Sequence, residues 1–192
     1  MGHFNITLIK DRLLKINLKG KCPICIESKL KNFPYYLSEN KTKKHFEMVH
    51  IDTVLNSDES IYRNKYFFTI MDDYSRYGWT FFLKSKADMF PTFLNWYNKI
   101  KNIFNKSIKY LKTDNGTEYC NSRFNIFCDN NGITHLYFVT YNPQQNGKEE
   151  RFQQTLIQCE RALLNDSKLH YTFWLDAVST ANYIYNRLSQ MY

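Results

Sequence analysis

Apolar and polar positions alternate in short runs through the middle of the chain. Three runs rich in β-branched and aromatic residues, at 48–54, 66–71 and 78–83, are each bounded by Asn, Asp, Ser or Gly, which is typical of strands. Because these runs follow one another closely, we expect an antiparallel meander.

Later segments carry apolar residues at helical spacing. Residues 88–104 place them at i, i+3, i+4 and i+7, which predicts an amphipathic helix with Asp88 as N-cap and Pro91 in the first turn. Further elements are expected as strands at 108–111 and 133–139 and as helices at 122–130, 152–163 and 173–188. The order β-β-β-α-β-α-β-α-α predicts an α/β protein with a five-stranded mixed sheet flanked by helices.

The first 46 residues differ from the rest in pattern and in charge. A loose helical periodicity over 4–18 ends at Gly20, and a polar, Lys-rich stretch follows a Cys-Pro-Ile-Cys turn. The formal net charge of the chain is +8; residues 1–46 hold ten Lys or Arg against three acidic residues, and residues 47–192 are nearly neutral. This asymmetry predicts a domain boundary near Phe46, and it predicts that affinity for a polyanion resides mostly in the N-terminal segment.

Composition excludes several classes of protein. With 43% hydrophobic and 17% aromatic residues, the chain has enough apolar side chain to bury a core, which excludes disorder. The apolar runs are too short for a membrane span or a secretion signal. Five cysteines without such a signal favour reduced thiols. We therefore expect a cytosolic or nuclear compartment.

Three acidic residues stand where a sheet of this kind could bring them together. Asp52 lies inside an apolar strand, where a carboxylate is costly to bury unless it is paired or binds a cation. Asp114 follows a strand and precedes Asn115-Gly116, at the sheet edge where α/β sites gather, although an ordinary turn explains it equally well. Glu150 stands beside Glu149 at a helix start, where negative charge is favourable in any case.

Five sequence blocks, in order and over nearly the whole chain, carry a resemblance to a known family. The blocks are His50-Ile-Asp52, Met71-Asp-Asp-Tyr-Ser-Arg76, Thr113-Asp-Asn-Gly-Thr-Glu-Tyr119, Asn142-Pro-Gln-Gln-Asn-Gly147 with Glu150-Arg151, and Phe173-Trp174 with Ala177-Val178 and Ala181-Asn-Tyr-Ile-Tyr-Asn-Arg187. Together they resemble the integrases of copia-type LTR retrotransposons, and the last block distinguishes this branch from retroviral integrases.

The resemblance implies a ribonuclease-H-like fold for a catalytic core at 47–192. In such a core Asp52, Asp114 and Glu150 would hold Mg²⁺ or Mn²⁺ for DNA 3′-end processing and strand transfer. A pair of divalent ions activates the attacking oxygen and stabilises the leaving oxygen, and hard oxygen ligands suit Mg²⁺. The implied partners are the DNA of the element's terminal repeats, host target DNA and further copies of the chain. The implied locations are the nucleus and a cytoplasmic particle.

Polar residues around the third acidic residue are candidate DNA contacts. The loop 141–148 is rich in Gln and Asn, which allows a flap that touches DNA ends or an ordinary connection. The candidate nucleic-acid-binding residues are Gln144, Gln145, Asn146, Lys148 and Arg151.

Two further features have simpler interpretations. Asp72 and Asp73 precede Tyr74-Ser75-Arg76 at an expected hairpin, so we expect a turn with a local Asp–Arg contact and leave both outside the site. His50 shares a strand face with Asp52 and could orient the site, but a satisfied core imidazole is the favoured interpretation.

The N-terminus resembles part of the integrase zinc module. His3, Cys22 and Cys25 supply three of the four ligands that tetrahedral zinc requires, and the missing His would precede Met1. We therefore expect a partial zinc module at 1–28, a basic linker at 29–46, and a chain that is a fragment. A second departure from the family is Gln153-Gln154-Thr155, where Asn-Arg-Thr is usual, which removes a cation beside Glu150.

Three function classes follow. The first is a metal-dependent DNA integrase, a polynucleotidyl transferase and nuclease. The second is a decayed, non-catalytic remnant that still binds nucleic acid or protein, and the third is a cellular nuclease of the same fold. The intact acidic residues favour the first, the incomplete zinc module favours the second, and the block at 173–187 is unexplained by the third.

Overall fold

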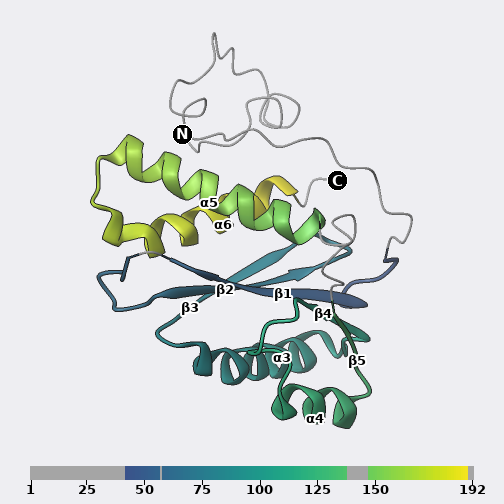
Figure 1. Cartoon of the computed structure of the whole chain (residues 1–192). Helices are drawn as coiled ribbons and strands as arrows, with labels where there is room; N and C mark the ends of the chain where they lie inside the picture. The colour runs from purple at the N-terminus through teal and green to yellow at the C-terminus, as the bar shows by residue number, and fades with distance from the viewer. Residues whose placement is uncertain (1–41, 57, 138–146, 190–192) are drawn as a thin grey trace, which may run out of the picture.

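A five-stranded sheet lies between two layers of helices (Figure 1). The computed structural model describes residues 42–56, 58–137 and 147–189. Its elements are β1 Met48–Leu55, β2 Tyr66–Asp72, β3 Gly78–Leu83, α3 Met89–Phe104, β4 Tyr110–Thr113, α4 Ser122–Asn131, β5 Thr134–Tyr137, α5 Gly147–Ser167 and α6 Trp174–Ser189. Short 3₁₀ turns, η1 Lys86–Asp88 and η3 Tyr171–Phe173, precede α3 and α6.

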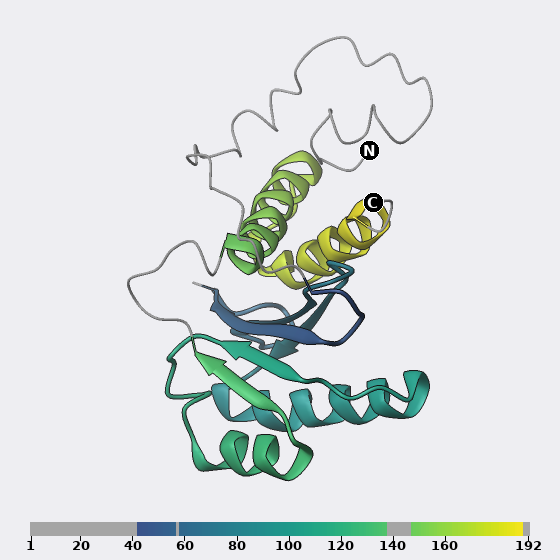
Figure 2. The same ribbon diagram turned by 90° about the vertical axis from the view of Figure 1, so that its right-hand side faces the viewer.

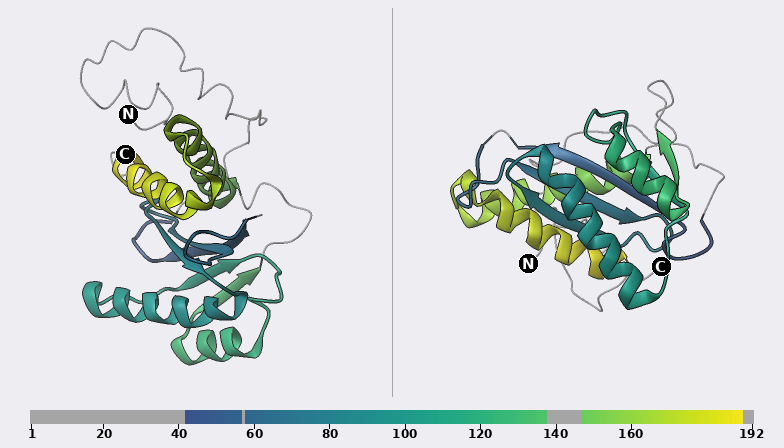
Figure 3. Two further views of the ribbon diagram at one scale, coloured as in Figure 1. Left: turned by 90° about the vertical axis from the view of Figure 1, so that its left-hand side faces the viewer. Right: turned by 90° about the horizontal axis from the view of Figure 1, so that it is seen from below.

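The sheet has the strand order β3-β2-β1-β4-β5. Strands β1, β2 and β3 pair antiparallel, whereas β4 pairs parallel with β1 and β5 parallel with β4. Helices α5 and α6 cover one face, and α3 and α4 cover the other (Figures 2 and 3). The predicted meander, element order and five-stranded mixed sheet are therefore confirmed.

The two faces of the central strand β1 differ in chemistry. Val49 and Ile51 are fully buried and pack with α3 and α4 in the larger core cluster. His50 and Asp52 alternate with these residues along the strand and so lie on the opposite face. Val54, on that same face, packs against the apolar cluster of α5 and α6. The strand therefore carries its polar residues beneath helix α5.

The start of α3 is as predicted, with Pro91 in the first turn, and a short 3₁₀ turn precedes it. Asp88 is the N-cap residue of α3, but its side chain makes no capping hydrogen bond there. Its carboxylate instead accepts from the backbone N and Oγ of Ser85, at 3.0 and 3.1 Å, and closes the capping box of η1. The extra turn precedes the helix because Ser85 and Asp88 have the Ser-x-x-acid spacing of such a box.

The packed core begins before strand β1. Phe46 is only 6% exposed and lies in the larger core cluster, and its backbone N donates to Asp72 at 2.9 Å. The Thr42 hydroxyl donates to Asp73 at 2.7 Å. The predicted domain boundary thus falls in a segment that packs against the sheet, while the N-terminal helical pattern and the predicted zinc module lie outside the described residues.

None of the described helices is long and apolar enough to cross a membrane. Within the described ranges, Cys120, Cys128 and Cys159 are free thiols. Burial raises the pKa of the Cys128 thiol to about 11, so it is an inert core group.

Glycine at the start of β3 allows α5 and α6 to approach the sheet. A Cβ at Gly78 would overlap the ring of Phe152, which is 1% exposed on α5. Asn186 of α6 receives a hydrogen bond from the backbone N of Gly78 at 2.8 Å and donates one to its carbonyl at 2.7 Å. This contact fixes the α5–α6 layer above the face of the sheet that carries His50 and Asp52.

We expect Gly78→Ala to lower the free energy of unfolding by about 1–3 kcal/mol through overpacking. Phe152→Leu should relieve the overlap, so the double variant should be more stable than the sum of the two single effects implies. Thermal melts followed by circular dichroism measure this coupling. If the effects of the two substitutions on the free energy of unfolding simply add, overlap with the Phe152 ring is not the reason that position 78 requires glycine.

Candidate active site

Asp52 lies in the middle of β1, on the face that α5 covers. Its Oδ1 accepts from the backbone N of Thr53 at 2.6 Å, and the Gln153 side chain of α5 also bonds its carboxylate. Burial and then the nearby Asp114 charge raise the pKa of Asp52 to about 6. This carboxylate is therefore mostly buried within the fold and feels the charge of Asp114.

Asp114 directly follows β4, at the carboxyl edge of the sheet. Its Oδ1 accepts from the backbone N of Gly116 at 2.9 Å, which makes the turn that Asp-Asn-Gly predicts. A Cβ at Gly116 would stand 2.9 Å from that oxygen and from the carboxylate of Glu118. The turn and the site interpretations are therefore compatible, because the turn holds the Asp114 carboxylate near Asp52.

The two glutamates that open α5 have different surroundings. Glu149 is 1% exposed, with its Oε2 3.8 Å from His50 Nδ1, whereas Glu150 is only partly buried. Burial, followed by the charges of Asp52 and Asp114, raises the pKa of Glu149 well above its ordinary value. Neither carboxyl oxygen of Glu149 has a hydrogen-bond partner within the described part of the chain.

Helix geometry relates both glutamates to Gln153, the α5 residue that bonds Asp52. Gln153, which bonds Asp52, also donates to the Thr69 hydroxyl at 3.1 Å. Successive residues of a helix are rotated by about 100°, so Glu149 and Glu150 flank the direction of Gln153 on either side. Glu149 faces the sheet, and Glu150 lies toward the rim of the site.

A buried network of hydrogen bonds and an ion pair lies beside the carboxylates. The sequence pattern does not predict it. Asp73 accepts from His50 Nε2 at 3.0 Å and from Lys148 Nζ at 2.9 and 3.0 Å, so it ties β1 to the start of α5. Burial alone raises the pKa of the Asp73 carboxyl, but the hydrogen bonds, first that from His50, hold it well below its ordinary value. Burial lowers the pKa of His50 despite this neighbour, so the imidazole is a neutral donor.

The predicted hairpin turn is present alongside this network. Asp72 accepts from the backbone N and Oγ of Ser75, at 3.1 and 2.6 Å, and Arg76 lies 3.7 Å from Asp73. The local Asp–Arg contact and the buried imidazole are thus confirmed. The Met71–Arg76 block marked this region, but no local pattern indicates that Asp73 also bonds a lysine 75 residues away.

The other predicted site residues are distributed as follows. Lys148 is held in the ion pair with Asp73, and Arg151 is exposed on α5. Outside the described residues lie Gln144, Gln145, Asn146, His3, Cys22 and Cys25.

The site fits a divalent cation by the chemistry of its donors. Among the described residues, no group of three or more His, Cys, Asp or Glu side chains is already arranged to hold an ion. The carboxyl groups of Asp52, Asp114 and Glu149 nevertheless influence one another, two of them with raised pKa values. Crowded, partly buried carboxylates repel one another, and a hard divalent ion bound between them compensates that repulsion.

We expect Asp73→Asn to lower the free energy of unfolding by roughly 2–3 kcal/mol at pH 7, because Lys148 loses a largely buried partner. Since the folded-state pKa is depressed, this stabilisation is present above about pH 4 and is lost as the pH falls further. Chemical denaturation at pH 7 and pH 3 measures both effects.

The matched control is Glu59→Gln, which breaks the exposed ion pair with Lys65, 3.4 Å long. This change should cost less than about 0.5 kcal/mol. If the two variants lose equal stability, the Asp73 network does not anchor α5.

The chain is similar to several transposon polyproteins. It is 34% identical over 195 residues to the retrovirus-related Pol polyprotein from transposon TNT 1-94 of Nicotiana tabacum, covering 97% of the chain and 15% of the polyprotein. It is 29% identical to that of transposon RE2 of Arabidopsis thaliana, covering 87% and 11%, and 28% identical to the transposon Ty1-NL2 Gag-Pol polyprotein of Saccharomyces cerevisiae, covering 88% and 10%. The chain thus spans at most about a seventh of these relatives.

A solved structure shares the fold. The chain superposes with a TM-score of 0.58 and 17% identity on a chain in the cryo-EM structure of the simian T-cell lymphotropic virus intasome in complex with PP2A regulatory subunit B56 gamma, covering 84% of this chain and 56% of that one. A family model described as the integrase core domain matches residues 43–143. The matched residues include Asp52 and Asp114 and end before Glu150. The resemblance to copia-type integrases is therefore confirmed, and the chain belongs to the integrase core domain family.

Proposed function

We propose that this chain carries out the DNA chemistry of a retrotransposon integrase, namely 3′-end processing and strand transfer of element DNA into host DNA. The single observation that carries the proposal is the partly buried Asp52 carboxylate beside Asp114, with a pKa raised to about 6. A fold with no catalytic use for these groups would gain stability by losing them. The ribonuclease-H-like arrangement of the strands is consistent with this reaction.

We assign Mg²⁺ or Mn²⁺ to Asp52, Asp114 and Glu150. When bound, the metal would activate the attacking oxygen and stabilise the leaving oxygen of the phosphodiester. Asp52 supplies its carboxylate from a rigid central strand, and the Gly116 turn orients that of Asp114. Gln153 orients Asp52 from α5 through its amide.

Glu150 is favoured over Glu149 as the third ligand because of their different exposure. Mg²⁺ keeps several of its waters in protein sites, so its ligands face an open rim. Glu150 is partly exposed and directly precedes Arg151, as in the family pattern, whereas Glu149 is buried. Glu149 then packs beside His50, with its Oε2 3.8 Å from His50 Nδ1.

The remaining assignments extend the same proposal. Arg151 contacts DNA together with Gln144, Gln145 and Asn146, while Lys148 contributes to binding only where it leaves Asp73. His3, Cys22 and Cys25 form an incomplete zinc site in a separate N-terminal module. The partners are terminal-repeat DNA, target DNA and further copies of the chain, in the nucleus and in a cytoplasmic particle.

The rival is a decayed integrase that retains the fold and binds nucleic acid without catalysis. Gln154, which stands where the family usually has a cation, favours weaker DNA binding in either case. The two candidates differ in what the acidic residues do, since only the first requires them to bind metal.

Matched variants of the two neighbouring glutamates test the assignment. Glu150→Gln and Asp114→Asn should each lower Mn²⁺-dependent strand transfer of terminal-repeat oligonucleotides by roughly a hundredfold or more, because each removes a metal ligand. Glu149→Gln should keep activity within a few-fold, because Glu149 is buried beside His50 and is not one of the proposed metal ligands. Mn²⁺ affinity, measured by calorimetry, should follow the same order.

DNA affinity in EDTA should be unchanged in all three variants, since the Lys-rich segments are untouched. If Glu149→Gln is the inactive variant, the third ligand has been misassigned. A wild-type chain that neither binds Mn²⁺ nor joins DNA, although it binds oligonucleotides, establishes the decayed remnant instead.

The acidic site should also cost stability in the absence of metal. The folded-state pKa of Asp52, about 6, lies above its ordinary value, so ionisation destabilises the fold as the pH rises from about 4 to 6. Asp52→Asn should therefore raise the free energy of unfolding of the metal-free protein by roughly 1–2 kcal/mol at pH 8 and leave it unchanged near pH 4. Urea unfolding in EDTA at both pH values measures this, and an equal effect at both would contradict it.

A further inference from the structure

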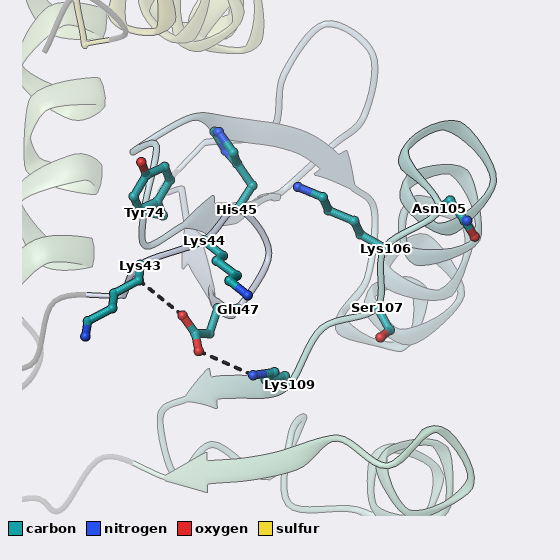
Figure 4. Close-up of a pocket in the computed structure, with 9 residues that line it drawn as sticks. All are labelled: Lys43, Lys44, His45, Glu47, Tyr74, Asn105, Lys106, Ser107 and Lys109. Atoms are coloured by element: carbon teal, nitrogen blue, oxygen red, sulfur yellow. Dashed lines mark hydrogen bonds and ion pairs between the residues drawn. The ribbon is translucent and has the colours of Figure 1, made fainter.

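A pocket lined by lysines lies beside the amino ends of β1 and β4 (Figure 4). Its volume is about 460 Å³. Three chain segments form it: residues 43–47 before β1, Tyr74 in the β2–β3 turn, and residues 105–109 between α3 and β4. Since β1 and β4 run parallel, this is the amino end of both strands, whereas Asp114 stands at the carboxyl end of β4.

Positive charge in this pocket exceeds negative charge. Lys43, Lys44, Lys106 and Lys109 line it with a single acidic residue, Glu47. Glu47 is already engaged, because it accepts from the backbone N of Lys43 at 3.1 Å and pairs with Lys109 at 3.5 Å. Among the described residues, no carboxylate pairs with the ammonium groups of Lys44 or Lys106.

The side chains converge on one space. In Figure 4 Lys106 and Lys109 point across the pocket toward the side from which Lys44 reaches in. Glu47 interacts with Lys44 only at longer range than with Lys109, so the ammonium groups of Lys44 and Lys106 repel each other, and an anion between them removes that repulsion. The end of α3 accounts for a cation at Lys106, since helix carboxyl ends favour positive charge, but not for lysines that come from the segment before β1.

The pocket wall suits a nucleic-acid backbone. Tyr74 is 48% exposed and packs edge-on against His45, with ring centroids 4.8 Å apart. Exposed aromatic rings beside lysines, with the polar side chains of Asn105 and Ser107 on the other side, offer contacts to both sugar and phosphate.

We propose that this pocket binds backbone phosphates of duplex DNA, as a second contact separate from the catalytic carboxylates. The five residues from Lys109 to Asp114 span roughly 15 Å along the strand, which corresponds to about five base pairs of duplex rise. The pocket and the carboxylates are thus separated by a length that one duplex can span. Only the choice of DNA as the phosphate source rests on the proposed integrase function; the preference for phosphodiester anions rests on the lysines.

The test uses the full chain in EDTA, so that metal binding and catalysis do not enter. Affinity for a fluorescent 20-base-pair duplex is measured by anisotropy as a function of salt. Lys44→Gln with Lys106→Gln should weaken binding and reduce the slope of log K against log salt by about 2, one per lost phosphate contact. All variants retain the lysines of residues 1–41, so that contribution is common to them.

The matched control removes the same charge elsewhere, through Lys65→Gln with Lys99→Gln, both exposed. This control variant should change the slope of log K against log salt by less than half as much as the variant with Lys44→Gln and Lys106→Gln. Glu47→Gln, which frees Lys109, should tighten binding and steepen the slope by about 1. Because Gln keeps an acceptor for the Lys43 backbone N, the fold should survive, and circular dichroism verifies this.

Polyglutamate of matched charge is the competitor that tests for an acidic protein partner. Polyglutamate should displace the duplex from the wild-type chain no more effectively than it displaces the duplex from the variant with Lys44→Gln and Lys106→Gln. Equal slope changes in the pocket and control variants would overturn the proposal, and so would displacement by polyglutamate that depends on the pocket lysines. Neither result bears on the metal-site variants, so the proposed function stands or falls separately.

Discussion

The burial of one polar strand face beneath a helix is the constraint from which the site follows. Strand β1 is central in the sheet, and its inner face carries His50 and Asp52 under helix α5. Charged and polar groups taken out of water must be paired or neutralised, or else they destabilise the fold. The fold meets this constraint differently at the two positions.

At His50 the constraint is met within the chain. The neutral imidazole donates to Asp73, and Lys148 supplies the opposite charge. At Asp52 the constraint is not met. The carboxyl groups of Asp52 and Glu149 both have raised pKa values, and the charge of Asp114 contributes to both shifts. Hydrogen bonds from Gln153 and Thr53 offset the shift of Asp52 only in part. One end of the polar face therefore anchors α5, and the other end holds crowded acidic groups available for a cation. Because the anchor and the site share helix α5, rigidity at Lys148 fixes where Glu149 and Glu150 stand.

Local chemistry accounts for what the sequence predicts correctly. Strand alternation places His50 and Asp52 on one face, and Asp-Asn-Gly places Asp114 in a turn at the sheet edge. The parts not predicted depend on long-range contacts. Asp73 behaves locally as a turn residue, as expected, and its contact with Lys148 arises only when α5 folds over the sheet. Which of two adjacent glutamates faces inward is likewise set by the packing of Phe152 against Gly78, which no helical pattern reveals.

If Asp52 is a metal ligand as proposed, a divalent ion must displace the proton that its raised pKa retains below about pH 6. Calorimetric titration of the full chain with Mn²⁺, in two buffers of different ionisation enthalpy, measures the protons released on binding. We expect about one proton to be released at pH 5, falling toward zero by pH 8, and this release to be lost in Asp52→Asn. Identical heats in both buffers at every pH, with Mn²⁺ bound, would show that the metal does not bind at this carboxylate.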